Sequence, residues 1–116
     1  MTDSAAPIRA AVVGCGGAGR NHAAGYRTAA DADFVAVCDL DRERADELAA
    51  DYDVIAYDDL DALLDERDPD VVSVATPEKY HVEPTITALE AGADVFCEKI
   101  MADSVAGGRR MVETAE

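Results

Sequence analysis

The segment at residues 10–19, AAVVGCGGAG, constrains the fold of this chain more than any other. In it, a short apolar run leads into three glycines with the spacing Gly14-x-Gly16-x-x-Gly19. In a dinucleotide-binding unit the first glycine makes the tight turn after a strand, and the second lets the backbone approach a pyrophosphate. The third lets the following helix lie close to the sheet, and all three roles depend on the missing Cβ atom. We therefore expect a strand, an anion-binding turn and a helix, in that order.

The context of the glycines decides between a nucleotide site and a simple turn, and Asp39 supplies that context. It follows the apolar segment FVAVC, at the spacing of about 20 residues expected for an acid that binds ribose hydroxyls. A carboxylate there favours NAD over NADP because it repels a 2′-phosphate. Arg42 and Arg44 lie close enough in sequence to weaken that preference, so NADP stays open as the alternative cofactor. The other interpretation of Asp39 is an acid stabilised by the dipole of the next helix.

The charge balance of the chain is strongly acidic. Its 116 residues include 25 Asp and Glu against 10 Lys and Arg, for a formal net charge of −15. Such a surface repels nucleic-acid phosphates and anionic lipids, so we expect neither a nucleic-acid nor a membrane partner. One hypothesis for the acidity is adaptation to a high-salt cytoplasm, because salt screens the self-repulsion.

No apolar run approaches the about 18 residues that a membrane span needs. Residues 1–7 form a short polar tail, which we expect to be disordered and which lacks the apolar core of a signal peptide. These features favour a cytoplasmic protein.

The three cysteines are odd in number and unevenly spaced, at Cys15, Cys38 and Cys97. They do not suggest a disulfide framework. Because no CxxC or CxxxH pair is present, we expect no metal site and interpret the cysteines as small buried thiols.

Strand-like and helix-like segments alternate along the chain. Strands are predicted at residues 8–13, 34–38, 54–57, 71–75 and 94–97, and helices at residues 17–30, 43–51, 59–66 and 83–91, with a last helix from Ser104. This alternation predicts an α/β fold with a doubly wound parallel sheet, a Rossmann fold of about five strands with flanking helices over residues 8–116. Ligands of such sheets bind at the carboxyl ends of the strands. The glycine loop, Asp39, Thr76-Pro77 and Glu98-Lys99 are expected to meet there.

Three segments carry a resemblance to a known family: AVVGCGGAGRNHAAGY, CDLDRERADELAADY and VSVATPEKYHVEPTITALEAGADVFCEKIMA. The last is the most specific, because it combines a TP-x-x-x-H turn, an AL-x-AG helix end and an EK motif after the fifth strand. Over nearly its whole length the chain resembles the N-terminal domain of the Gfo/Idh/MocA oxidoreductases. These enzymes use NAD(P) and act on sugars, cyclitols and related polyols.

The resemblance implies roles for individual residues. It places pyrophosphate binding at Gly14, Gly16, Gly17, Ala18 and Gly19, ribose binding at Asp39, the lining of the cofactor groove at Thr76 and Pro77 with His81 beside it, and Glu98 by the nicotinamide ribose. Lys99 corresponds to the catalytic lysine that contacts the reacting hydroxyl and assists proton transfer. The chain departs from the family motif at Ile100, where the family has proline; isoleucine frees the φ angle after Lys99 and restores a backbone N–H there.

The family's second α/β domain, which supplies the substrate pocket, has no counterpart in these 116 residues. We therefore expect nucleotide binding without turnover, as the cofactor-binding part of a dehydrogenase. The alternatives are a stand-alone regulatory or redox-sensing module, or a subunit whose partner chain brings the missing half. A methyltransferase that binds S-adenosylmethionine is disfavoured by the glycine spacing and the EK segment. An open sheet edge at Val95 and Phe96 would favour a homo-oligomer.

Overall fold

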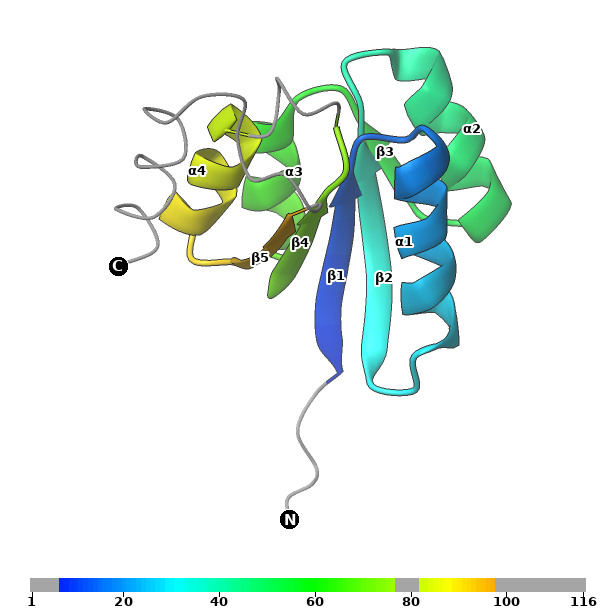
Figure 1. The fold of residues 1–116 in the computed structure, drawn as a ribbon, viewed down its shortest axis with the longest axis horizontal. Helices are drawn as coiled ribbons and strands as arrows, with labels where there is room; N and C mark the ends of the chain where they lie inside the picture. The colour runs from blue at the N-terminus through cyan, green and yellow to red at the C-terminus, as the bar shows by residue number, and fades with distance from the viewer. Residues whose placement is uncertain (1–6, 77–81, 98–116) are drawn as a thin grey trace.

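The structure is a computed structural model, and it describes residues 7–76 and 82–97 (Figure 1). The elements are β1 (Ile8–Val13), α1 (Gly17–Thr28), β2 (Ala32–Cys38), α2 (Arg42–Tyr52), β3 (Ile55–Tyr57), α3 (Leu60–Arg67), β4 (Val71–Val74), α4 (Val82–Glu90) and β5 (Asp94–Cys97). All strand pairs are parallel, and the order across the sheet is β3-β2-β1-β4-β5. The predicted Rossmann fold is confirmed. The chain reverses its direction across the sheet between β1 and β4, which is where ligands of such folds bind.

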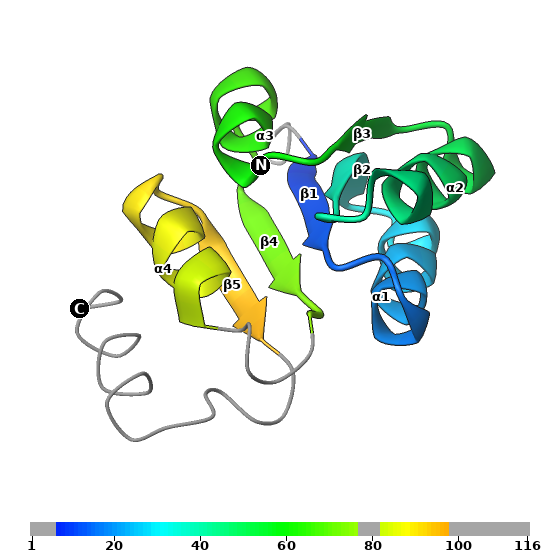
Figure 2. The same cartoon turned by 90° about the horizontal axis from the view of Figure 1, so that it is seen from above.

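Helices cover both faces of the sheet (Figure 2), so two apolar layers form. Alternate residues of β1 point to opposite layers: Val12 joins the core beneath α1 and α2, and Val13 joins the core beneath α3 and α4. Leu48 of α2 and Leu63 of α3 are the largest fully buried side chains of the two helix layers. Burial on both faces explains why β1, β2 and β4 read as nearly continuous apolar runs.

One polar residue interrupts the run in each of β1 and β4, and both have partners. The guanidinium of Arg9 donates to the carbonyl of Arg67 at the end of α3, and the Arg9 backbone N–H donates to the Asp70 carboxylate at 2.9 Å. Ser73, which is 1% exposed, shares a hydrogen bond with the hydroxyl of Tyr26 on α1. Buried polar groups need such partners. These contacts connect strand β1 to the α3–β4 turn and strand β4 to α1.

The ends of several elements differ from the prediction. Helix α1 ends at Thr28 rather than at residue 30, β2 begins at Ala32 rather than 34, β3 begins at Ile55 rather than 54, and β4 ends at Val74 rather than 75.

Side-chain caps set two helix starts. Asp41 accepts hydrogen bonds from the amides of Glu43 and Arg44, and Asp59 accepts one from the amide of Asp61. The C-caps Asp53 and Asp68 adopt left-handed φ angles of 56° and 45° without the glycine that marks such a position in sequence. Gly92, by contrast, has the expected positive φ of 94° after α4.

Strand β5 forms one edge of the sheet within the described residues, and β3 forms the other. Val95 packs against the core beneath α3 and α4, whereas Phe96 is 56% exposed and meets only the ring of His22 among the described aromatic contacts. The predicted last helix from Ser104 and the predicted disordered tail, apart from Pro7, lie outside the described residues.

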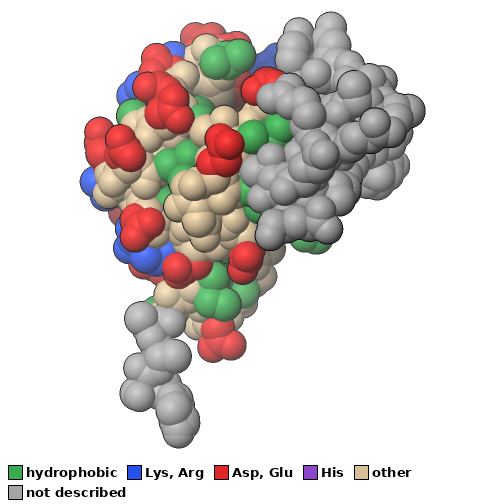
Figure 3. Space-filling model, turned by 90° about the vertical axis from the view of Figure 1, so that its left-hand side faces the viewer, with side chains coloured by type: hydrophobic (Ala, Val, Ile, Leu, Met, Phe, Trp, Pro, Cys, Tyr) green, Lys and Arg blue, Asp and Glu red, His purple; other side chains and the backbone are tan. Residues whose placement is uncertain are grey.

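On the face shown in Figure 3, the acidic side chains of the described residues are spread out rather than gathered in one place, with fewer Lys and Arg side chains among them. Among the helices that the structure describes, none has the length and apolar content that a membrane crossing requires.

Candidate functional site

The glycine loop lies where the carboxyl ends of β1, β2 and β4 meet. The Gly14 N–H donates to the Cys38 carbonyl at 2.8 Å, and the Ala75 N–H donates to the Val13 carbonyl at 2.7 Å. Gly14 has a φ of +96°, and a Cβ atom there would lie 2.7 Å from the backbone N of Thr76. Only glycine fits this turn, because the chain leaving β4 passes directly against it. The sequence-predicted Gly14 and Thr76 are thus brought together.

The three motif glycines divide into packed and open positions. A Cβ on Gly19 would lie 1.8 Å from the Gly14 carbonyl oxygen, so the start of α1 is pressed against the turn. A Cβ on Gly16 or Gly17 would meet no atom of residues 7–76 and 82–97 within 4 Å. Gly14 and Gly19 therefore shape the loop, and the neighbourhood of Gly16 and Gly17 is open to a ligand.

The N-terminus of α1 differs from those of α2 and α3. Its N-cap is Gly16, which offers no side-chain hydrogen bond, and its first turn carries no acidic residue. Gly17 and Ala18 are both exposed there. The amides of an uncapped first turn and the positive end of the helix dipole favour an anion. The open cradle therefore fits the pyrophosphate of a dinucleotide.

Asp39 is tied to the glycine loop. One carboxylate oxygen accepts from the Cys15 N–H at 2.8 Å, and the other accepts from the Asp41 N–H at 2.8 Å. The capping acid of α2 is Asp41, so Asp39 does not serve as the helix cap. Each oxygen of an ionised carboxylate can accept a further hydrogen bond, which leaves capacity for a pair of ribose hydroxyls.

Two features beside Asp39 were not apparent from the sequence. Leu40, directly after Asp39, is 92% exposed, an unusual environment for a leucine. Its position after the end of an apolar strand was the available signal. The second feature is the Cys15 amide, whose bond to Asp39 joins the two halves of the motif across 24 residues of sequence.

The comparisons with known proteins establish the family. A family model described as the oxidoreductase family with an NAD-binding Rossmann fold, Gfo/Idh/MocA, matches residues 8–116. The chain belongs to this family. The predicted NAD-binding character follows from the same match, because the matched part is the NAD-binding fold itself.

Two relatives of the Gfo/Idh/MocA chain are dehydrogenases that it matches over nearly its whole length. D-glucoside 3-dehydrogenase of Escherichia coli K12 is 44% identical over 117 residues, which cover 99% of this chain and 33% of that protein. Inositol 2-dehydrogenase of Salmonella typhimurium is 31% identical over 112 residues, with 94% and 33% covered. This chain thus spans about a third of the length of the curated relatives it matches.

Solved structures agree with the family assignment. The WlbA dehydrogenase of Bordetella pertussis, in complex with NADH and UDP-GlcNAcA, has a TM-score of 0.89 and 30% identity, covering 94% of this chain and 34% of that one. The myo-inositol dehydrogenase of Lactobacillus casei, in complex with NAD(H) and myo-inositol, has a TM-score of 0.86 and 30% identity, covering 93% and 33%. Both matches extend over nearly all of the chain.

Four predicted site residues of the Gfo/Idh/MocA motif, Pro77, His81, Glu98 and Lys99, lie outside the described residues. The roles that the resemblance gives them stay predictions. Among the described residues, no three His, Cys, Asp or Glu side chains are grouped so as to hold a metal ion.

Cys15, in the glycine loop, and Cys38, at the end of β2, are both buried, with exposed fractions of 3% and 4%. Cys15 Sγ donates to the Cys38 carbonyl at 3.5 Å. Burial raises the pKa of each thiol to about 12, and the negative charge of Asp39 adds to the rise. Both thiols are therefore protonated at neutral pH, which disfavours a thiol-based sensor at these two positions because the thiolate is the reactive form.

We expect the stability of the chain to fall as the pH rises above about 9. In the unfolded chain the two thiols lose their protons near 9.0, whereas in the folded chain they hold them to about 12. The folded state then binds more protons, so the unfolding free energy decreases by up to about 1.4 kcal/mol per pH unit and thiol within that window. Chemical denaturation from pH 8 to 10.5 measures the slope.

The matched control is Cys38→Ala, which removes one of the two titrating thiols and should halve their share of the slope. Cys97→Ser in both proteins removes the remaining thiol from the comparison. An equal slope with and without Cys38 would contradict the assignment of a raised pKa to this buried group.

Proposed function

We propose that this chain is the NAD-binding domain of a dehydrogenase that transfers hydride between a nicotinamide cofactor and a sugar, cyclitol or related polyol. The observation that carries the proposal is the open cradle at Gly16 and Gly17, tied through Cys15 to the carboxylate of Asp39. The names of the relatives, a glucoside and an inositol dehydrogenase, support the substrate class.

The described residues bind and orient the dinucleotide. The amides of Gly17 and Ala18 at the uncapped start of α1 donate to the pyrophosphate, and Asp39 accepts from the adenosine ribose hydroxyls. The exposed side chain of Leu40 offers an apolar surface for the adenine next to that ribose. When bound, the nicotinamide supplies the hydride chemistry.

The remaining predicted residues complete the site by their resemblance to the family motif. In this proposal Thr76, Pro77 and His81 border the cofactor, Glu98 lies by the nicotinamide ribose, and the Lys99 amine holds the proton of the reacting hydroxyl. The substrate pocket belongs to a further domain or a partner chain, so that these 116 residues bind nucleotide without turnover. Association of two copies through the β5 edge, with Phe96 exposed, is part of the same proposal.

A titration with NADH, followed by cofactor fluorescence, tests this function. The acidity of the chain recommends molar salt, where its self-repulsion is screened. We expect saturable binding, and we expect Gly16→Ala to weaken it about tenfold or more, equivalent to ~1.4 kcal/mol, because the new Cβ occupies the open cradle.

The matched control is Gly25→Ala, because an added Cβ at this glycine of α1 would meet no atom of the described residues within 4 Å. It lies two turns further along α1, away from the loop, and should leave NADH binding unchanged. If the wild-type chain is folded by circular dichroism yet binds neither NADH nor NADPH, the proposal is wrong.

A further inference from the structure

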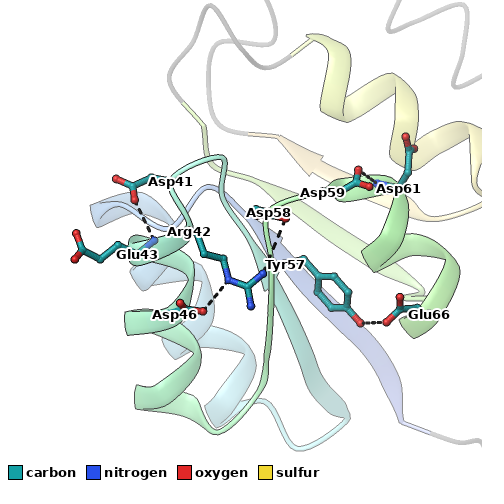
Figure 4. A network of polar contacts seen from close by, with 9 residues as sticks. All are labelled: Asp41, Arg42, Glu43, Asp46, Tyr57, Asp58, Asp59, Asp61 and Glu66. Atoms are coloured by element: carbon teal, nitrogen blue, oxygen red, sulfur yellow. Dashed lines mark hydrogen bonds and ion pairs between the residues drawn. The ribbon is translucent and has the colours of Figure 1, made fainter.

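The side chain of Arg42 lies between two carboxylates, Asp46 and Asp58 (Figure 4). We propose that Asp46 and Asp58 are positioning residues for cofactor selectivity, which hold the Arg42 guanidinium away from the ribose end of the cradle. Asp39 then faces the ribose without a counter-charge, and the site selects NAD against NADP. This inference rests on the proposed function, because it concerns the same dinucleotide site.

Arg42 is the residue that could otherwise reverse the selectivity. It lies three residues after Asp39, as the first residue of α2. An arginine near this ribose can accommodate the 2′-phosphate of NADP, because its guanidinium makes paired, charge-assisted hydrogen bonds to phosphate oxygens. A free Arg42 would therefore offset the repulsion that Asp39 exerts on that phosphate.

The guanidinium of Arg42 is engaged on two sides. Its Nε donates to Asp46 Oδ1 at 3.0 Å, one helical turn along α2, and its Nη1 lies 4.0 Å from Asp58 Oδ1, just after β3. The two partners come from different elements, so they fix the side chain across the α2–β3 corner rather than along the helix alone. Figure 4 shows the side chain running toward Asp46 and Asp58 and away from Asp41, which caps α2.

Arg44 is the second arginine of this segment, and it is paired as well. Its Nε lies 3.6 Å from Asp41 Oδ2. Because Asp41 also caps α2, a substitution there would disturb the helix. Asp46 and Asp58 have no capping role among the described hydrogen bonds, which makes them the suitable positions for a test.

The side chains of these ion pairs are about half exposed, with exposed fractions of 54% for Arg42, 56% for Asp46 and 57% for Asp58. Exposed ion pairs are individually weak and are screened by salt, so the two carboxylates hold the guanidinium in this position only modestly. We expect Asp46→Asn/Asp58→Asn to lower the ratio of the NADPH to the NADH dissociation constant about three- to tenfold.

The experiment measures NADH and NADPH binding at the lowest salt concentration at which the wild-type chain is folded. Four proteins are compared: the wild type, Asp46→Asn/Asp58→Asn, the same double variant with Arg42→Ala, and Asp65→Asn/Glu90→Gln. The last removes two exposed acids from α3 and α4 and is matched to the double variant in net charge. Circular dichroism establishes that each protein is folded.

The proposal is supported if the ratio falls in the double variant, returns toward the wild-type value when Arg42 is also removed, and is unchanged in the charge-matched control. A fall that persists without Arg42, or an equal fall in the control, would overturn it in favour of a general charge effect. An unchanged ratio in a double variant that still binds NADH would overturn this inference alone. A folded wild type that binds no nucleotide would overturn the proposed function with it.

Discussion

Replacing Gly19 with alanine is expected to destabilise the chain by at least ~3 kcal/mol. The new Cβ would lie 1.8 Å from the Gly14 carbonyl oxygen and 3.4 Å from a Val12 methyl carbon. The obstructing atom is backbone, held in place because Gly14 itself is bonded to the Cys38 carbonyl, so no side-chain rotation relieves the clash. Since a domain has about 5–15 kcal/mol of stability in total, the loss is a large fraction of it. Urea denaturation measures this difference.

Gly25→Ala is the control for the Gly19 variant, because it makes the same substitution in the same helix, α1. Its Cβ would meet no atom within 4 Å in the part of the chain that the structure describes, and alanine in a helix interior is favoured over glycine by about 1 kcal/mol. We expect this variant to be as stable as the wild type or more so. A Gly19→Ala protein with the stability of the Gly25→Ala protein would show that α1 does not pack on the turn as the structure has it.

The order of strands and helices could be predicted from the sequence because each element carries its own local pattern. The apolar run of β1, the glycine spacing after it and the leucines of α3 are patterns within a few residues of one another, and such patterns predict local structure. The ends of the elements were harder to predict from the sequence. Asp53 and Asp68 terminate helices in a left-handed conformation that aspartate adopts far less readily than glycine, and their sequence context does not distinguish them from other surface acids.

The candidate site was predictable in its residue types and less so in its connections. The spacing of Gly14, Gly16 and Gly19 indicates a cradle, but only the packing separates the closed positions from the open Gly16. The pairing of Arg42 with Asp58 joins α2 to the residue after β3, and it depends on how the two elements cross. Such long-range contacts arise from tertiary packing, which a local sequence pattern does not predict.

Removing the carboxylate of Asp39 is expected to have the largest effect on ligand binding. Asp39→Ala would take away the acceptor for the ribose hydroxyls together with the bonds to the Cys15 and Asp41 amides, each 2.8 Å long. Hydrogen bonds to a charged group contribute about 1.5–3 kcal/mol, so we expect NADH affinity to fall about tenfold to a hundredfold. Titration of NADH and NADPH against the folded variant measures the change.

Asp39→Asn separates the charge from the shape of the side chain. The amide keeps one oxygen as an acceptor but loses the negative charge, so the repulsion of a 2′-phosphate should disappear while part of the NADH binding survives. We expect NADH affinity between those of the wild type and Asp39→Ala, and a smaller preference for NADH over NADPH than in the wild type. Asp65→Asn, an exposed acid on α3, controls for the change in net charge. If Asp39→Asn and Asp65→Asn gave the same preference, the Asp39 carboxylate would have no direct role at the ribose, and its bonds to the Cys15 and Asp41 amides would be its whole contribution.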